Sequence, residues 1–571
     1  MYSSSQLIPP LDLFNSEYDP RLPHAARASS RESFPGVIKP LDLTVVAMPF
    51  EQGMRCPLRD LGVTSIDPPA LLGNRVHQGR LYANLSWAMW MADMLPGADA
   101  SDVEQEQFGQ RIEVRIARPE ISKAEKSAAK RHKLRFYAGL TNAILGAKKR
   151  FEKHLALRHN LVLASRTNSE LDALIVPWQD ELIKACEWDT RSTLAGQVII
   201  TALRRALGVN QEHSLVALLS DLGEMESAAP VQKIRDIAQV AKRRNPTLAR
   251  ALKSSYQRWE TLHEIDANAH DALRAVVDRY GYRSLAQFLI SAPSWAEDPT
   301  PVMDAFVGKL LASGKDKTHP HTQTEAARSA IMAAAGTLKR AHINTLVKLA
   351  QRCARARQRA NACLVVRVDM LRQLFREIAR RLLHADRIDE VGELYFLSLE
   401  EVRSALTGDI STDLRKEAAL RRTEVETLEA RGEADELICG HEPVAFSSPE
   451  KNAEVRVLHG LGVSGSAVEG VARVVNSSDE LDIFKAGEIL VASHIDAGWT
   501  PYFTLAAAVI VETGGLLTHT SVVARELGLA AMVHVQGATR VIRNGDRLRL
   551  DPASGEVHIL VCTEGESIAV L

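Results

Sequence analysis

The chain has 571 residues, of which 46% are hydrophobic and 25% are charged, and its formal net charge is −1. This length exceeds what one hydrophobic core supports, so two to four domains are expected. The balanced charge argues against a protein built around nucleic acid or an acidic membrane surface. Six scattered cysteines without metal-ligand spacing, and no apolar segment long enough to cross a bilayer, predict a cytoplasmic protein that binds no metal.

The composition and periodicity of the sequence change at about residue 36. Residues 1–35 are rich in Ser, Pro and Arg and lack periodicity, which predicts a disordered or loosely ordered leader. A mainly helical domain is expected over residues 36–406, with a small β-rich start in which residues 36–42 and 79–86 form strands. A stripe of aromatic and methionine residues at helical spacing then predicts a core helix: Trp87, Trp90, Met91 and Met94.

The stretch between residues 102 and 406 has a helical pattern. It is rich in Ala, Leu, Arg, Glu and Gln, and its apolar residues recur every three or four positions between Gly and Pro breaks. This pattern predicts an α-helical bundle. The basic run 123–153 alternates with apolar residues at helical spacing, so we interpret it as a solvated helix face and expect no nucleic-acid partner. A charged helix over 413–431 belongs to a predicted linker and hinge, residues 407–455.

The last part of the chain, residues 456–571, is rich in Val and Gly and predicts a small α/β domain. An apolar run, residues 506–511, is typical of a buried strand, and Gly514 and Gly515 break it. His519 follows at the start of a short helix, where free backbone N–H groups and the helix dipole favour an anion. An imidazole in that position can accept and carry a phosphoryl group.

Three further stretches of this domain follow the order of a known family: residues 465–475, 486–503 and 544–557. Together with the glycine–histidine turn, they resemble the phosphohistidine (swivelling) domain of phosphoenolpyruvate-utilising enzymes such as phosphoenolpyruvate synthase, pyruvate phosphate dikinase and rifamycin phosphotransferase. The resemblance implies that His519 carries the phosphoryl group. Loop-shaping or charge-stabilising roles are then expected for four residues near it: Gly514, Gly515, Thr518 and Arg525.

The helical region also resembles this family. Residues 354–361, 365–383 and 393–401 are similar to a block of the central domain, although Gln358 stands where that block has a glutamate. The resemblance implies an acceptor-binding domain. Three arginines are its candidates for holding the transferred phosphoryl group, since a guanidinium offers phosphate a bidentate fork: Arg357, Arg359 and Arg372. A polar loop adds two candidate general bases for an acceptor hydroxyl, His319 and His321.

An ATP-grasp domain normally loads the histidine in this family, and we find neither its Gly-rich loop nor its paired magnesium carboxylates in the sequence. Mg²⁺ and ATP are therefore expected on an ATP-grasp partner subunit, with neither bound by this chain alone. This design resembles split enzymes of the phenylphosphate synthase type. It implies transfer of the β-phosphoryl of ATP to His519 and on to a small phenolic hydroxyl, giving an aryl phosphate, AMP and phosphate.

Three alternatives remain open for the function. The acceptor could be an antibiotic or an alcohol, as the likeness to rifamycin phosphotransferase suggests. A phosphorylated acceptor could be an intermediate in a condensation. The chain could also be a phosphocarrier that passes the group to another protein.

Overall fold

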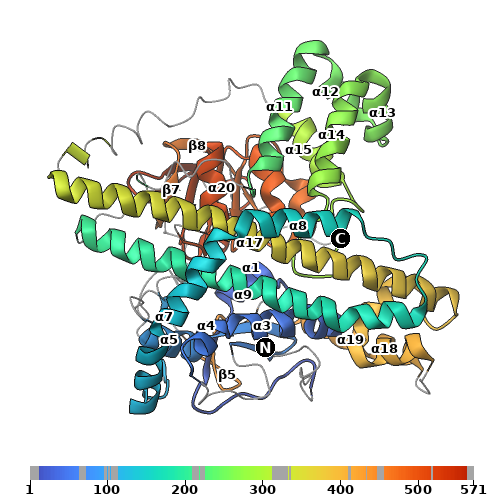
Figure 1. Cartoon of the computed structure of the whole chain (residues 1–571). Helices are drawn as coiled ribbons and strands as arrows, with labels where there is room; N and C mark the ends of the chain where they lie inside the picture. Colours follow the sequence, from blue (N-terminus) through green and yellow to red (C-terminus); the bar gives the residue numbers. More distant parts are fainter. Residues whose placement is uncertain are drawn as a thin grey trace.

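The computed structural model describes residues 12–63, 73–95, 100, 103–104, 114–208, 218, 226–311, 329, 332–333, 336–408, 413–432, 434–445, 456–515 and 518–561. A mostly helical central region is followed by a small α/β domain (Figure 1), which confirms the predicted fold class. In this described part of the chain, none of the helices combines the length and the apolar character that a membrane span requires.

A five-stranded sheet joins the two ends of the central region, in the strand order β2-β3-β1-β4-β5. Its strands are β1 (His24–Ala26), β2 (Asn74–His77), β3 (Arg80–Asn84), β4 (Leu437–Cys439) and β5 (Glu442–Pro443). β1 lies between β3 and β4 and is antiparallel to both, so that Ala25 faces Asn84 on one side and Ile438 on the other. Residues more than four hundred positions apart in sequence therefore share one sheet.

The start of the chain differs from the sequence expectations in two places. Within the expected leader, residues 24–33 form β1 and α1 (Ala28–Ser33), and Arg27 is buried. The predicted strand over residues 36–42 is wrong. Its last three residues form α2 (Pro40–Asp42), because a proline at the first helical position has its φ already set for a helix.

After α2 the chain continues in helical elements as far as Asp60, with a single turn residue, Arg55, between the last two. The elements are the π-helical turn η2 (Leu43–Ala47), α3 (Met48–Met54) and α4 (Cys56–Asp60). β3 confirms the strand expected over residues 79–86, and α5 (Leu85–Met94) confirms the core helix, because Trp87 and Trp90 are buried.

Two long helices form the centre of the helical region, α9 (Asn168–Leu207) and α17 (Thr337–His384), and they lie side by side (Figure 1). They are antiparallel: Leu203 near the end of α9 shares a cluster with Val347 of α17, whereas Leu171 shares one with Leu382. The shorter helices α7 (Lys123–Leu145) and α8 (Ala147–His159) pack on this pair.

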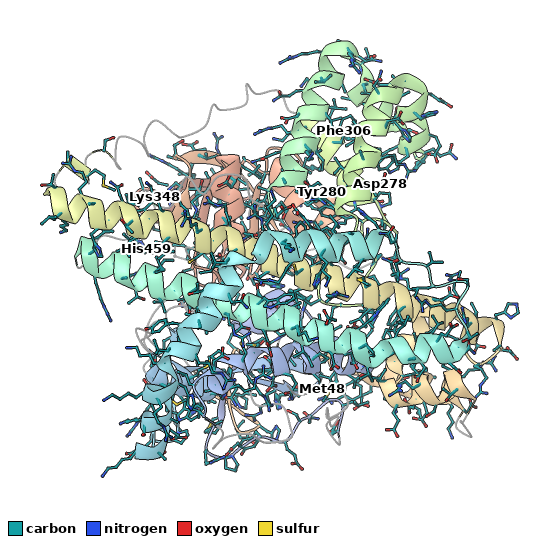
Figure 2. The ribbon with its side chains drawn as sticks, in the orientation of Figure 1. Met48, Asp278, Tyr280, Phe306, Lys348 and His459 are labelled. Atoms are coloured by element: carbon teal, nitrogen blue, oxygen red, sulfur yellow. The ribbon has the colours of Figure 1, made fainter. Side chains whose placement is uncertain are left out.

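Five shorter helices project from one side of the long pair, away from its ends, and are green in Figure 1. They are α11 (Ala229–Arg244), α12 (Leu248–Ser254), α13 (Arg258–Ile265), α14 (Ala267–Tyr280) and α15 (Thr300–Leu311). Phe306 on α15 and Tyr280 at the end of α14 are both buried in the core of the helical region (Figure 2).

The end of the central region contains η3 (Val391–Phe396), α18 (Leu399–Thr407) and α19 (Leu414–Ala430). α19 confirms the charged helix predicted over 413–431, and Asp413 caps it by accepting a hydrogen bond from the Lys416 amide. Leu414 and Leu428 join the main core, and β4 joins the sheet, so this part of the expected linker is built into the central region. Residues 446–455 of the expected linker lie outside the described residues.

The C-terminal domain contains an eight-stranded sheet with the order β6-β13-β12-β8-β9-β10-β11-β7. The strands are β6 (Val457–His459), β7 (Leu461–Ser464), β8 (Val468–Val474), β9 (Ile489–Ala492), β10 (Ala508–Val511), β11 (Ala530–Val533), β12 (Arg547–Asp551) and β13 (Glu556–Val561). Strands β8 to β11 are parallel neighbours. The connecting helices are η4 (Ser478–Ile483), η5 (Ala497–Thr504), α20 (His519–Leu527) and α21 (Ala538–Val541).

The C-terminal domain packs on the helical region at two glycines. A Cβ atom on Gly308 of α15 would lie 1.7 Å from Leu505 Cδ2, and one on Gly498 of η5 would lie 1.8 Å from the Ser284 carbonyl oxygen. Neither position has room for a side chain, so each glycine permits a close approach. Leu505 belongs to a hydrophobic cluster that also contains residues of α9 and α17.

Candidate functional site

His519 is the first residue of α20, the helix that connects the parallel strands β10 and β11. The side chain of His519 lies outside the described part of the structure. The backbone places the start of α20 beyond the carboxyl end of β10, which is the edge at which parallel sheets bind ligands. The predicted strand, turn and helix are thus confirmed, and so is the expected C-cap, because Gly528 has a φ of 63°.

Residues 512–515 and 518, here called the histidine loop, are held by hydrogen bonds around one carbonyl group. The Gly515 carbonyl oxygen accepts from the Thr518 amide at 3.1 Å, from Thr518 Oγ1 at 2.9 Å and from Ser521 Oγ at 2.6 Å. Gly514 has a φ of 116°, which residues with a side chain rarely adopt. The backbone groups of Gly515 and the side chain of Thr518 thus form the hydrogen bonds of this loop, and the roles expected for Gly514, Gly515 and Thr518 in phosphoryl transfer stay predictions.

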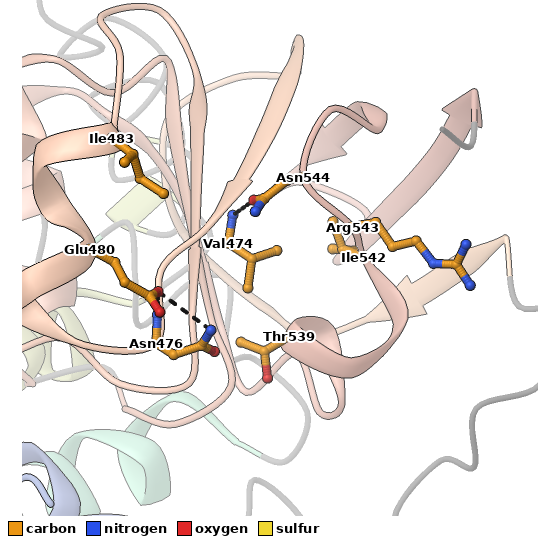
Figure 3. Close-up of a pocket in the computed structure, with 8 residues that line it drawn as sticks. All are labelled: Val474, Asn476, Glu480, Ile483, Thr539, Ile542, Arg543 and Asn544. Carbon is orange, nitrogen blue, oxygen red and sulfur yellow. Dashed lines mark hydrogen bonds between the residues drawn. The ribbon is translucent and has the colours of Figure 1, made fainter. Parts of the chain in front are cut away.

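Glu512, the first residue of the histidine loop, is hydrogen-bonded to a residue that lines a pocket of the same domain. Glu512 Oε1 accepts hydrogen bonds from the Thr539 amide and from Thr539 Oγ1, each at 2.7 Å. Burial raises the pKa of Glu512, and the two bonds from Thr539 oppose that rise. Thr539 also lines a pocket of about 380 Å³ between β8, η4 and α21 (Figure 3). In that pocket, Glu480 accepts from the Asn476 amide and Asn544 Oδ1 from the Val474 amide.

Arg525 lies in the last turn of α20, about 9 Å along the helix axis from His519. It is buried, and burial lowers its pKa to about 10, an effect that nearby Glu526 opposes. This position suits support of the helix end, and a contribution to the phosphoryl charge stays a prediction.

The three predicted phosphoryl-binding arginines are not brought together. Arg372 is fully buried, with Nη1 donating to Asp369 Oδ1 at 2.8 Å and Nη2 to the Leu289 carbonyl oxygen at 3.0 Å. It lies about 22 Å along α17 from Arg357. Arg357 and Arg359 are half-buried. The predicted bases His319 and His321 lie outside the described residues.

Arg357 lies near the place where α20 meets the helical region. Val522, one turn after His519, shares a small buried cluster with Ala354 of α17 and Ala228 at the start of α11. Arg357 follows Ala354 by three residues, so it is on a similar face of α17, one turn further along. Among the three arginines predicted to bind phosphate, Arg357 is therefore the nearest along α17 to the contact with α20.

Sequence reasoning missed a carboxylate near Arg357, Asp189 of the paired helix α9. Its Oδ1 oxygen is closed off from solvent and has no hydrogen-bond partner in the described part of the chain, although the residue as a whole is partly exposed. Burial raises the pKa of Asp189 to about 6, and the positive charge of Arg357 opposes that rise. Asp189 occupies the register of the buried stripe formed by Leu182, Cys186 and Gly196. The sequence signal that could have revealed Asp189 is a carboxylate at a position where the helical periodicity of residues 168–207 predicts an apolar side chain.

Comparison with known proteins finds two matched segments. Residues 484–555, which include His519, match the mobile domain of PEP-utilising enzymes. Residues 190–367, which include Arg357, match the fourth domain of rifampicin phosphotransferase. The fold and the histidine loop thus define a swivelling-type α/β domain attached to a helical domain. Two segments of the chain are thus similar to parts of PEP-utilising enzymes, which confirms the resemblance read from the sequence.

Three relatives show how far the similarity extends. The uncharacterized protein Rv2047c of Mycobacterium tuberculosis is 28% identical over 565 residues, which is 96% of this chain and 62% of the relative. A rifampicin phosphotransferase of a Streptomyces species is 29% identical over 52% of this chain and 35% of its own length. Prodigiosin synthesizing transferase PigC of Serratia marcescens is 30% identical over 50% and 33%. The chain thus spans less than two thirds of each of these relatives.

Proposed function

We propose that this chain is a phosphotransferase that carries a phosphoryl group on His519 and delivers it to the hydroxyl of a small acceptor. The observation behind the proposal is the position of His519 as the first residue of α20, after a hydrogen-bonded glycine loop, within the segment that matches the mobile domain. The backbone N–H groups at such a helix start are donors for phosphate oxygens. Transfer then depends mainly on positioning and charge neutralisation.

The proposed phosphoryl donor is MgATP bound to an ATP-grasp partner subunit. The partner places the β-phosphoryl group on His519 and releases AMP and phosphate. The C-terminal domain then presents the group to the acceptor in the helical region. We propose a phenolic acceptor, since a phenol (pKa about 10) loses its proton more readily than an aliphatic alcohol.

A second candidate acceptor is an antibiotic hydroxyl. It is favoured by the match of half of this chain to proteins named rifampicin phosphotransferase, from Streptomyces and from Bacillus subtilis. Product analysis after incubation with phenol or with rifampicin distinguishes the two: the proposed function predicts phenyl phosphate, and the second candidate predicts a phosphorylated antibiotic.

The carrier role is tested with a chemical donor that needs no partner. The wild-type chain incubated with phosphoramidate should acquire one acid-labile phosphoryl group, located on His519 by mass spectrometry. His519→Ala should acquire none and remain folded. His459→Ala, which changes an exposed histidine of the same domain, is the matched control and should be labelled like the wild type. An equal acid-labile label on the H519A variant would refute the carrier role.

The partner is tested separately with ATP labelled at the β-phosphate. The purified chain alone should remain unlabelled, and addition of an ATP-grasp subunit should produce labelled His519 and AMP. Labelling of the purified chain by ATP without any other protein would show that no partner is required.

A further inference from the structure

Delivery of a phosphoryl group to a hydroxyl requires a group that takes the hydroxyl proton, and the structure offers one on α9, the helix that packs along α17. The cluster of Val522, Ala354 and Ala228 brings α20 against α17 one turn before Arg357. Gln358, next to Arg357, has no carboxylate, but the facing helix α9 supplies one in Asp189. Near the contact of α17 with α20, the paired helices α17 and α9 thus supply a cation suited to phosphate and an acid whose Oδ1 has no hydrogen-bond partner among the described residues.

We infer that Asp189 is the general base of the acceptor site, where its carboxylate takes the proton of the acceptor hydroxyl as that oxygen attacks the phosphoryl group on His519. The O–P bond forms, the N–P bond breaks, and the electron pair of that bond returns to the imidazole ring. The proton leaves the hydroxyl for Asp189 and then passes to solvent. This inference rests on the proposed function.

The surroundings of Asp189 allow it to act near neutral pH. The charged and titratable groups that face it are Arg357 and Cys363 of α17 and Cys186 of its own helix. Burial raises the pKa of both thiols, so they stay neutral and add no charge. A carboxyl group with a pKa of about 6 is largely ionised at pH 7 and is still basic enough to accept a proton during the transfer. A carboxylate with an ordinary pKa is a poorer base.

The test separates loading of His519 from its discharge. Wild type, Asp189→Asn and the control Asp180→Asn, on the same helix, are loaded with phosphoramidate. Each is then mixed with phenol, and phenyl phosphate is measured by phosphorus NMR. All three should load equally. The wild type and the control should discharge to phenol faster as the pH rises from 5 to 7. The D189N variant should discharge about 10²-fold more slowly or worse, without that pH dependence.

Two further measurements exclude a merely structural effect. Asp189→Glu should recover part of the rate, because it restores a carboxylate. With 4-nitrophenol at mildly alkaline pH the probe is already ionised, so the deficit of D189N should become small. A deficit of the same size with both phenols would overturn the role of a base.

The outcomes distinguish this inference from the function it rests on. Labelling that survives His519→Ala, or a wild-type chain that loads but discharges to none of phenol, methanol and rifampicin, refutes the proposed function and the base together. Wild-type discharge to phenol that is equally fast in the D189N variant, with the same pH profile, refutes the base alone.

Discussion

Packing of the C-terminal domain on the helical region depends on the absence of a side chain at Gly308. In Gly308→Ala the new Cβ would lie 1.7 Å from Leu505 Cδ2, so Leu505 or the whole η5 segment must move. Overpacking of this kind costs about 1–3 kcal/mol, which lowers the population of the packed arrangement about 5- to 150-fold. The intrinsic gain of alanine over glycine in a helix, about 1 kcal/mol, stabilises α15 itself and leaves the clash in place.

Hydrogen exchange of peptides covering residues 497–505 and 300–311 measures this effect. Both should exchange faster in the G308A variant, whereas Gly336→Ala, where a new Cβ meets open space, should leave them unchanged. Leu505→Ala removes the atom that clashes, so adding Gly308→Ala to that background should cost almost nothing. The expected coupling between the two sites is therefore about 1–3 kcal/mol. Exchange in the G308A variant equal to that of the wild type, or costs that add in the double variant, would refute the reasoning.

Two other predictions concern the C-terminal domain. Gly514→Ala forces a residue with a side chain into a φ of 116°, which should lower the free energy of unfolding by about 1–3 kcal/mol and reduce labelling by phosphoramidate. Gly515→Ala, whose Cβ meets nothing within 4 Å, should leave stability and labelling near those of the wild type. Equal losses in the two variants would contradict the loop geometry. Burial, with help from Arg31 and Arg27, lowers the pKa of His494 to about 3, so the unfolded state binds a proton from about pH 6.5 downward and the folded state does not. The contribution of His494 to the free energy of unfolding should therefore be fully present above pH 6.5. It should fall by up to about 1.4 kcal/mol per pH unit as the pH is lowered toward 3. Urea unfolding of His494→Asn should show a shallower decline between pH 6.5 and 5, and an identical slope would assign the pH effect to other groups.

The C-terminal site was largely predictable because its signals are local. Three signals stand close together in the sequence: a run of small and β-branched residues, a glycine turn, and a helical pattern that ends in glycine. The structure has β10, the positive φ of Gly514 and α20 at these positions. The helical character of the central region could be predicted for the same reason, since apolar periodicity is a local property of the sequence.

The remaining features depend on contacts distant in sequence, which a single sequence does not display. Strands β1 and β4 have three residues each, too short for an alternating pattern, and they pair with each other across more than four hundred residues of sequence. Arg372 was assigned to phosphate by residue type, yet its two Nη groups donate to Asp369 on the same helix and to the Leu289 carbonyl oxygen. Asp189 gains its properties from burial against α17, which becomes visible only when the two helices are placed together.

The position of β1 between β3 and β4 has a consequence for synthesis of the chain. One edge of β1 can pair with β3 as soon as residue 84 is available, but its other partner begins only at residue 437, about 350 residues later. At about 5–20 residues per second, the ribosome needs on the order of 20–80 s to reach β4. During that interval the backbone groups on this edge of β1 are an open template for a foreign strand. Completion of the sheet therefore waits for almost the whole central region, and a ribosome stalled before residue 437 would leave that edge exposed.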